Sequence, residues 1–261
     1  MRQSPIDMLV ALLLLTAPAG IAALRGVVSF ELDNVLWDSN KIRTGVSSEL
    51  RNFLADRAEQ PLDVYGELER LKEQGSQYGM MQPGAKAIQK ECLSIVLAAA
   101  GVTEESKDDL LIETLAMWLQ LQDTEANRWV AEEAVSALSA LKEKGFACCA
   151  ITSGIGDTTR TPVLAPLVEF TLCTYDFTVP ADTMWDVSMQ VAPAKIPEAM
   201  GLPWVHVGGP TEGGLAALGK QSRIKTIAVG EAGTLEGATP TKAIASLREL
   251  VDAVEEMVPE S

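Results

Sequence analysis

The apolar positions of the chain become orderly from Gly26 onwards. Residues 27–30 form a short apolar run with two valines, short enough to be a buried strand. The period then changes, and apolar residues recur at three- and four-residue spacing. This spacing predicts helices over residues 47–59, 62–73, 85–100 and 107–121, separated by residues typical of turns.

The second half of the chain alternates between the two periods. A helix predicted over residues 131–143 ends at Lys144 and Gly145 and leads into the apolar run 146–151. Strands that alternate with helices predict an α/β fold with a mostly parallel sheet, and the long helical block after the first strand predicts an inserted cap. Further strands are predicted over residues 170–174, 204–207 and 226–229, and helices over 215–219 and 242–257.

The composition limits the classes of protein to which this chain can belong. The chain has 261 residues, and its hydrophobic content of 47% is ample for a buried core. A net charge of -15, without a cluster of Lys and Arg, disfavours a nucleic-acid partner. The single histidine, His206, leaves only one candidate base for a Ser-His or Cys-His pair, and its place at a strand end favours a packed structural role.

Four cysteines are too few and too irregularly spaced for a disulfide scaffold or a zinc site. Cys148 and Cys149 are neighbours in a predicted strand, where successive side chains point to opposite faces. We therefore interpret both as small core residues.

Residues 1–25 carry a short apolar run after Arg2, followed by a segment in which Ala17 and Ala19 suit a cleavage site. We predict a signal or targeting segment, with an uncleaved anchor or an apolar helix packed on the domain as alternatives. Pro18 and Gly20 interrupt any longer membrane helix, so no stable transmembrane span is expected. A signal would direct the chain to the secretory, endomembrane or organelle route, and otherwise the chain would be cytoplasmic.

The first candidate site follows the first strand, because open α/β sheets bind ligands beyond the carboxyl ends of their strands. Glu31-Leu32-Asp33 and its apolar flanks resemble the first motif of haloacid dehalogenase-like (HAD) hydrolases, Asp-x-Asp-x-Thr or Val. In that family the first Asp attacks phosphorus and the second is the general acid and base. Here Glu31 stands at the first position, where its extra methylene moves the attacking oxygen by roughly an ångström. Asp33 keeps the second position.

The second family motif is a Ser or Thr that binds the phosphoryl group, and residues 151–154 resemble it with Thr152 in that position. The third motif is a Lys that neutralises the nucleophile and the phosphate. If Val179 and Pro180 occupy its place, the lysine is lost. The alternative is Lys195, which is otherwise a lysine facing solvent.

The fourth motif holds Mg²⁺ through two Asp side chains after a strand, and residues 204–215 resemble it in length and flanks. Both acidic positions are glycine, Gly209 and Gly214. Glu212 lies nearby at a position that the family does not use as a ligand. The resemblance therefore implies no cofactor, or a Mg²⁺ bound weakly through Glu31 and the backbone oxygen of Asp33.

The resemblance covers about residues 26–255 and implies a Rossmann-like three-layer core with an inserted α-helical cap. We place the core at 26–40 and 124–261 and the cap at 41–123. With Glu in place of Asp in the first motif and both acids replaced by Gly in the fourth, the chain is interpreted as an impaired or inactive phosphatase homologue with a binding, scaffold or regulatory role. Its partner would be a phosphorylated small molecule or a protein. The alternatives are an active phosphomonoester phosphatase that uses Glu31, and a function on another surface.

Overall fold

The structure is a computed structural model of the whole chain. Most of the predicted targeting segment lies outside the described residues, as does Glu212. No helix within the described ranges is long and apolar enough to cross a membrane. The described residues are 24–57, 63–77, 84–102, 104–154, 156–177, 179–180, 183–209, 213–218, 223–230 and 239–259.

The described part of the chain contains one sheet, whose six strands are all parallel and run in the order β3-β2-β1-β4-β5-β6. This confirms the predicted α/β fold with a parallel sheet. β1 lies in the middle, where Val28 pairs with Cys148 on one side and Val205 on the other. The strands are β1 (Gly26–Phe30), β2 (Phe146–Thr152), β3 (Thr171–Cys173), β4 (Trp204–Gly208), β5 (Ile224–Val229) and β6 (Lys242–Ile244).

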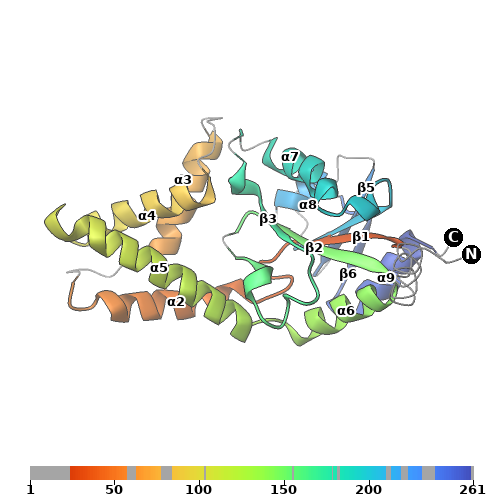
Figure 1. Cartoon of the computed structure of the whole chain (residues 1–261), viewed down its shortest axis with the longest axis horizontal. Coiled ribbons are helices and arrows are strands. Elements are labelled where there is room, and N and C mark those ends of the chain that lie inside the picture. Colours follow the sequence, from red (N-terminus) through yellow and green to blue (C-terminus); the bar gives the residue numbers. More distant parts are fainter. Residues whose placement is uncertain are drawn as a thin grey trace, which may run out of the picture.

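Helices cover both faces of the sheet, which gives three layers (Figure 1). Val28 and Phe30 pack in the cluster that contains α6 and α9, whereas Val27 packs in the cluster that contains α7 and α8. Cys148 packs in the first of these clusters and Cys149 in the second. Both are fully buried, which confirms their interpretation as core residues. These helices are α6 (Glu132–Glu143), α7 (Met184–Val191), α8 (Gly213–Leu218) and α9 (Leu250–Met257).

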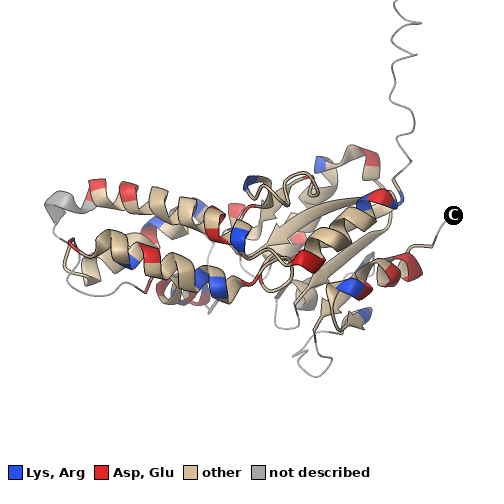
Figure 2. Ribbon diagram, turned by 90° about the horizontal axis from the view of Figure 1, so that it is seen from below, with Lys and Arg blue, Asp and Glu red and all other residues tan. Residues whose placement is uncertain are grey.

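Four helices lie between β1 and α6 and extend away from the sheet, which confirms the predicted helical cap (Figure 1). Acidic and basic residues are spread along them (Figure 2). The first begins at Ser39, earlier than predicted, because the Asp38 side chain accepts a hydrogen bond of 3.1 Å from the Lys41 amide and so caps the helix. The cap helices are α2 (Ser39–Leu54), α3 (Val64–Gln77), α4 (Ala85–Ala99) and α5 (Glu104–Arg128).

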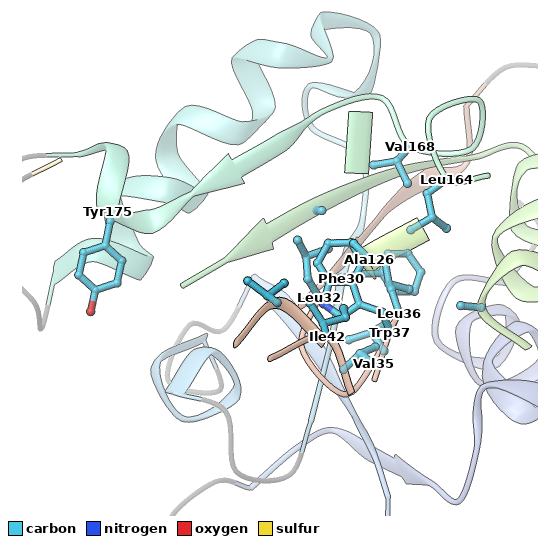
Figure 3. Packing of buried hydrophobic residues seen from close by; sticks show 14 of the residues in the cluster. Phe30, Leu32, Val35, Leu36, Trp37, Ile42, Ala126, Leu164, Val168 and Tyr175 are labelled. Atoms are coloured by element: carbon cyan, nitrogen blue, oxygen red, sulfur yellow. The ribbon is translucent and has the colours of Figure 1, made fainter. Parts of the chain in front are cut away.

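The two chain segments that join the cap to the core run side by side. Trp37, before α2, forms an antiparallel bridge with Val130, after α5, and the Ala131 amide donates to the Leu36 carbonyl at 2.9 Å. Trp37 is buried with Leu36 in the cluster drawn in Figure 3, against Ala126 of α5. The cap is therefore attached through a paired, well-packed junction.

The predicted helix over residues 242–257 is wrong in its first part. Lys242–Ile244 forms the edge strand β6, a short helical turn follows at Leu247–Glu249, and α9 begins only at Leu250. Three residues are too few to show a period of their own, so pairing with β5 decides the conformation. Sequence reasoning also did not predict α7.

Candidate functional site

The candidate residues of the first two motifs meet at the carboxyl edge of the sheet. Glu31 and Asp33 follow β1, and Thr152 ends β2 beside it. A Cβ placed on Gly154 would lie 3.1 Å from Asp33 Oδ2 and 3.1 Å from Thr152 Oγ1. The structure therefore brings Asp33 and Thr152 to the same loop, as expected for residues that follow adjacent parallel strands.

Asp33 and Thr152 are oriented by local hydrogen bonds. The indole Nε1 of Trp37 donates to Asp33 Oδ1 at 3.0 Å, and the Gly154 amide donates to Thr152 Oγ1 at 2.9 Å. Between Asp33 and Trp37 the chain turns through Asn34, whose φ of 58° lies in the left-handed region that Asn tolerates. Asp33 stays partly exposed, whereas Thr152 is buried.

Glu31 occupies a very different environment from Asp33. Its side chain is buried, with only 3% of the residue exposed, and burial raises the pKa of its carboxyl well above the usual range. The backbone amides of Gly209 and Gly214 lower the pKa in part. Neither carboxyl oxygen makes a hydrogen bond of normal geometry, so burial remains the largest influence on the pKa of Glu31.

The Glu31 side chain occupies the room in which a side chain at position 214 would lie. A Cβ on Gly214 would overlap Glu31 Oε1 and approach the Trp185 ring to 2.7 Å. A Cβ on Gly208 would lie 3.0 Å from Glu31 Cδ. The Glu31 side chain and the lack of a side chain at Gly214 therefore depend on each other in packing.

A chain of buried polar groups lies behind Glu31. The Trp204 indole donates to Ser29 Oγ at 2.8 Å, and this oxygen lies 2.9 Å from His206 Nδ1. His206 Nε2 lies 3.6 Å from Glu31 Oε1, and burial lowers the pKa of His206 to about 3. Burial therefore disfavours the charged form of both groups at this contact. The prediction of a packed structural histidine is confirmed.

The site does not gather ligands for a hard cation. The described residues contain no group of three or more His, Cys, Asp or Glu side chains that could hold a metal ion. Glu31 faces Gly214 and His206, whereas Asp33 faces Thr152 and Trp37. Burial also disfavours the ionised form of the Glu31 carboxyl, which is the form that binds Mg²⁺. These residues do not fit the two-motif magnesium site of the family.

The structure does not bring Lys195 together with Asp33 and Thr152. Lys195 is exposed and ends the short helical segment Ala192–Lys195, which leads to the start of β4. The other site residues lie at the opposite, carboxyl end of the strands. Its assignment to the third motif stays a prediction.

Sequence reasoning missed Lys72, which reaches the site from the cap. Its side chain is 14% exposed, and its Nζ donates to the Ser153 carbonyl at 3.2 Å, directly after Thr152. Lys72 also lines a small cavity with Asp33. No motif spacing could have revealed it, because it lies within a cap helix and not after a strand.

Described residues of the core and the cap together line a small cavity and a larger one. The smaller has a volume of about 20 Å³, enough for one water molecule, and is lined by Asp33 and Gly154 of the core and by residues of α2, α3 and α5. The larger has a volume of about 280 Å³. Its polar lining comes from Lys86 and Gln89 of α4 and from Asp157, Arg160 and Asp176 of the core.

Comparisons with known proteins agree with this architecture. No protein-family profile matches the chain, and no curated protein matches it by sequence. Among solved structures, a 2-haloacid dehalogenase from Pseudomonas syringae pv. Tomato is 23% identical, with a TM-score of 0.66 over 89% of this chain and 99% of that one.

Two further structures are similar at lower identity. A protein named as a HAD-hydrolase from Bacillus subtilis, bound to magnesium, is 15% identical with a TM-score of 0.60, covering 88% of this chain and 98% of that one. A defluorinating L-2-haloacid dehalogenase is 13% identical with a TM-score of 0.56, covering 88% and 95%. The chain has the HAD-superfamily fold, with a Rossmann-like core and a helical cap.

Proposed function

We propose that the chain is a catalytically impaired or inactive homologue of HAD phosphatases that binds a phosphorylated ligand between core and cap. The observation that carries the proposal is the state of Glu31. An attacking carboxylate must be ionised and directed at phosphorus. Burial disfavours the ionised form of Glu31, and its side chain is directed at Gly214 and His206.

The missing acids of the fourth motif support the same conclusion. Phosphoryl transfer depends on positive charge placed against the negative charge that develops in the transition state, which the family supplies with Mg²⁺. Gly209 and Gly214 carry no ligand atoms in their side chains. We therefore derive no step through a metal.

The features that remain suit binding. Asp33, Thr152 and the amides of the loop after β2 still frame the carboxyl edge of the sheet. The cavity of about 280 Å³ between α4, α5 and the core is close to the lower end of the usual range for small-molecule sites. Its lining carries both Lys86 and Arg160, and an anionic ligand would be drawn to such residues.

The test is hydrolysis of a generic phosphate monoester by the full chain, with and without Mg²⁺, beside Glu31→Ala. We expect no turnover above that of the variant. Metal-dependent turnover that is lost in Glu31→Ala would contradict the proposal and establish Glu31 as a working nucleophile or ligand.

One observation favours a second candidate, an active hydrolase with an atypical nucleophile position. Asp33 and Thr152 both lie beside Gly154, each 3.1 Å from a Cβ placed there, which supports a shared role for these two residues. An active site of this kind would require Glu31 to turn towards Thr152 and to lose its proton. Turnover that falls in both Glu31→Ala and Asp33→Asn would favour this candidate.

A further inference from the structure

We propose that the apolar segment 8–15, when the chain retains it, covers an apolar cavity at the amino edge of the sheet. The cavity has a volume of about 960 Å³ and lies at the starts of β4 and β5, at the edge of the sheet that points away from the cap (Figure 1). This surface takes no part in the proposed ligand site. Residues 1–25 would then be an apolar segment packed on the domain, which is one of the alternatives to a cleaved signal.

The lining of this cavity joins buried apolar side chains with exposed charged ones. Met189 of α7 and Trp204 of β4 are each 7% exposed, and Leu202 is partly buried. The charged residues of the lining, Asp186 and Arg223, are exposed. A cavity of this size, near the upper end of the range of about 300–1,000 Å³ for ligand sites, has room for several apolar side chains. Moving such side chains out of water and into the cavity is favourable.

The first described residues lie beside this cavity. The Val27 amide donates to the carbonyl of Pro203, a lining residue, at 3.0 Å. Val27 pairs with Trp204, which pairs on its other side with Ile224. Leu24 packs against the same apolar cluster as Ile224. The chain that precedes β1 is therefore attached next to residues that line the cavity.

The spacing along the sequence allows the apolar segment to reach the cavity. Residues 8–15 are Met-Leu-Val-Ala-Leu-Leu-Leu-Leu and carry no charge. The connection to Leu24, residues 16–23, can span at most about 28 Å when fully extended. Pro18 and Gly20 within it are typical of turns, so the chain can reverse its direction towards the cavity.

Attachment and charge both favour this occupant over a second molecule. The segment is joined to the domain a few residues from the cavity, so its effective concentration there is high. A second copy of the chain would bring a net charge of -15 against an equal charge, and an anionic membrane would be repelled as well. Left in water, the apolar segment would form an exposed patch prone to association. Packing into the cavity removes both apolar surfaces from water.

The test is hydrogen–deuterium exchange of the full chain, followed by mass spectrometry for residues 8–15. An isolated helix of this length is marginal in water, so slow exchange of its amides reports packing on the domain. We expect exchange about tenfold or more slower than in a synthetic peptide of residues 1–23. Leu202→Asp places a charge in the lining and should speed exchange of the segment by about tenfold or more.

Val163→Asp is the matched control, because Val163 is an apolar residue of the core that is 42% exposed and lies outside the lining. It should leave exchange of the segment unchanged. Exchange of the β2 amides in the same spectra reports whether each variant is folded. Leu13→Asp, within the segment, alters none of the lining residues and should speed exchange as Leu202→Asp does.

Fast exchange of residues 8–15 in the wild-type chain, or equal protection in Leu202→Asp, would overturn the proposal. Protection that rises with protein concentration would assign the cavity to a second copy. Protection that appears only with phosphatidylcholine vesicles would assign the segment to a membrane, and either of these results would also overturn it. Assays of phosphate monoester hydrolysis do not bear on this surface, so failure of the proposed function would leave it intact.

Discussion

Glu31 and Asp33 are two residues apart at the end of the same strand, yet their surroundings are opposite. Glu31 is buried beside Gly208 and Gly214, and its carboxyl oxygens lack hydrogen bonds of normal geometry. Asp33 accepts a hydrogen bond from Trp37 and lines a cavity shared with the cap.

This difference indicates which half of the candidate site is suited to contact with solutes. On the Glu31 side, the strand end is packed like the interior of the protein. On the Asp33 side, polar groups of the core still face cations of the cap. Four substitutions test this contrast, and we order them by the size of the expected effect on stability.

The largest effect is expected for Gly214→Asp. The new side chain would compete with Glu31 for the same space and would bury a second acid against the Trp185 ring, which should lower the free energy of unfolding by about 3 kcal/mol or more. Urea denaturation followed by circular dichroism measures the change. Gly84→Asp is the matched control, because a Cβ there meets only the Tyr175 carbonyl, at 3.8 Å.

The double variant Glu31→Ala/Gly214→Asp sharpens this test. Removing the Glu31 carboxyl empties the contested space, so the two changes together should cost less than the sum of their separate effects. Strictly additive effects would contradict the packing coupling between the two positions.

Ser29→Ala should have the next largest effect. It leaves the buried Trp204 indole and His206 Nδ1 without their shared partner, which should lower the free energy of unfolding by about 1–3 kcal/mol. Thermal unfolding compares it with Ser136→Ala, at an exposed position of α6 where we expect almost no change. Equal melting temperatures for the two variants would refute the structural role of the buried chain.

Glu31→Gln should stabilise the protein at neutral pH. Because the folded-state pKa of Glu31 is raised, the wild-type chain loses stability as pH rises above the ordinary value of 4.5, and the glutamine chain does not. The gain should be largest at neutral pH, should shrink as the pH falls towards 4.5, and should vanish near pH 4. Melting temperatures measured across this range, with Glu49→Gln on the exposed side of α2 as control, would reveal it.

Titration of His206 cannot produce the same pH-dependent difference in stability between the wild-type chain and Glu31→Gln. Its folded-state pKa is lowered to about 3, so the folded histidine stays neutral while the unfolded one gains a proton as pH falls below 6.5. That loss of stability on acidification is common to the wild-type chain and to Glu31→Gln, and it cancels in their difference. A gain that does not depend on pH would contradict the raised pKa of the buried Glu31 carboxyl.

The smallest effect is expected for Asp33→Asn. The amide oxygen can still accept from the Trp37 indole, and the residue is partly exposed, so the free energy of unfolding should change by no more than about 0.5 kcal/mol. Chemical denaturation is again the measurement. A loss as large as that of Ser29→Ala would show that both carboxyls are embedded in the core, and the contrast between them would fail.

Most of the fold could be predicted from the sequence because its elements have strong periods. The buried strands at 146–152 and 204–208 and the cap helices are long or apolar enough to be read locally. The edge strand Lys242–Ile244 could not, because only its partner β5 makes it a strand. Likewise, the early start of α2 depends on a side-chain hydrogen bond from Asp38 and not on apolar spacing.

The candidate site was predictable only where it follows strand ends. Asp33 and Thr152 come together because their strands are adjacent and parallel. The direction of the Glu31 side chain depends on the absence of a side chain at Gly214, and the approach of Lys72 depends on how the cap packs on the core. Both features depend on tertiary packing, which a local sequence pattern does not reveal.

The pairing of Trp37 with Val130 also has a consequence for how the chain folds. β1 must find β2 across the whole cap, and contacts so distant in sequence slow folding because a long loop must first be closed. Helices form through local contacts and much faster. Once the cap helices have packed, their two ends already lie together at the bridge, so the long search becomes a short one. Packing of the cap therefore shortens the loop that must close before β1 can pair with β2.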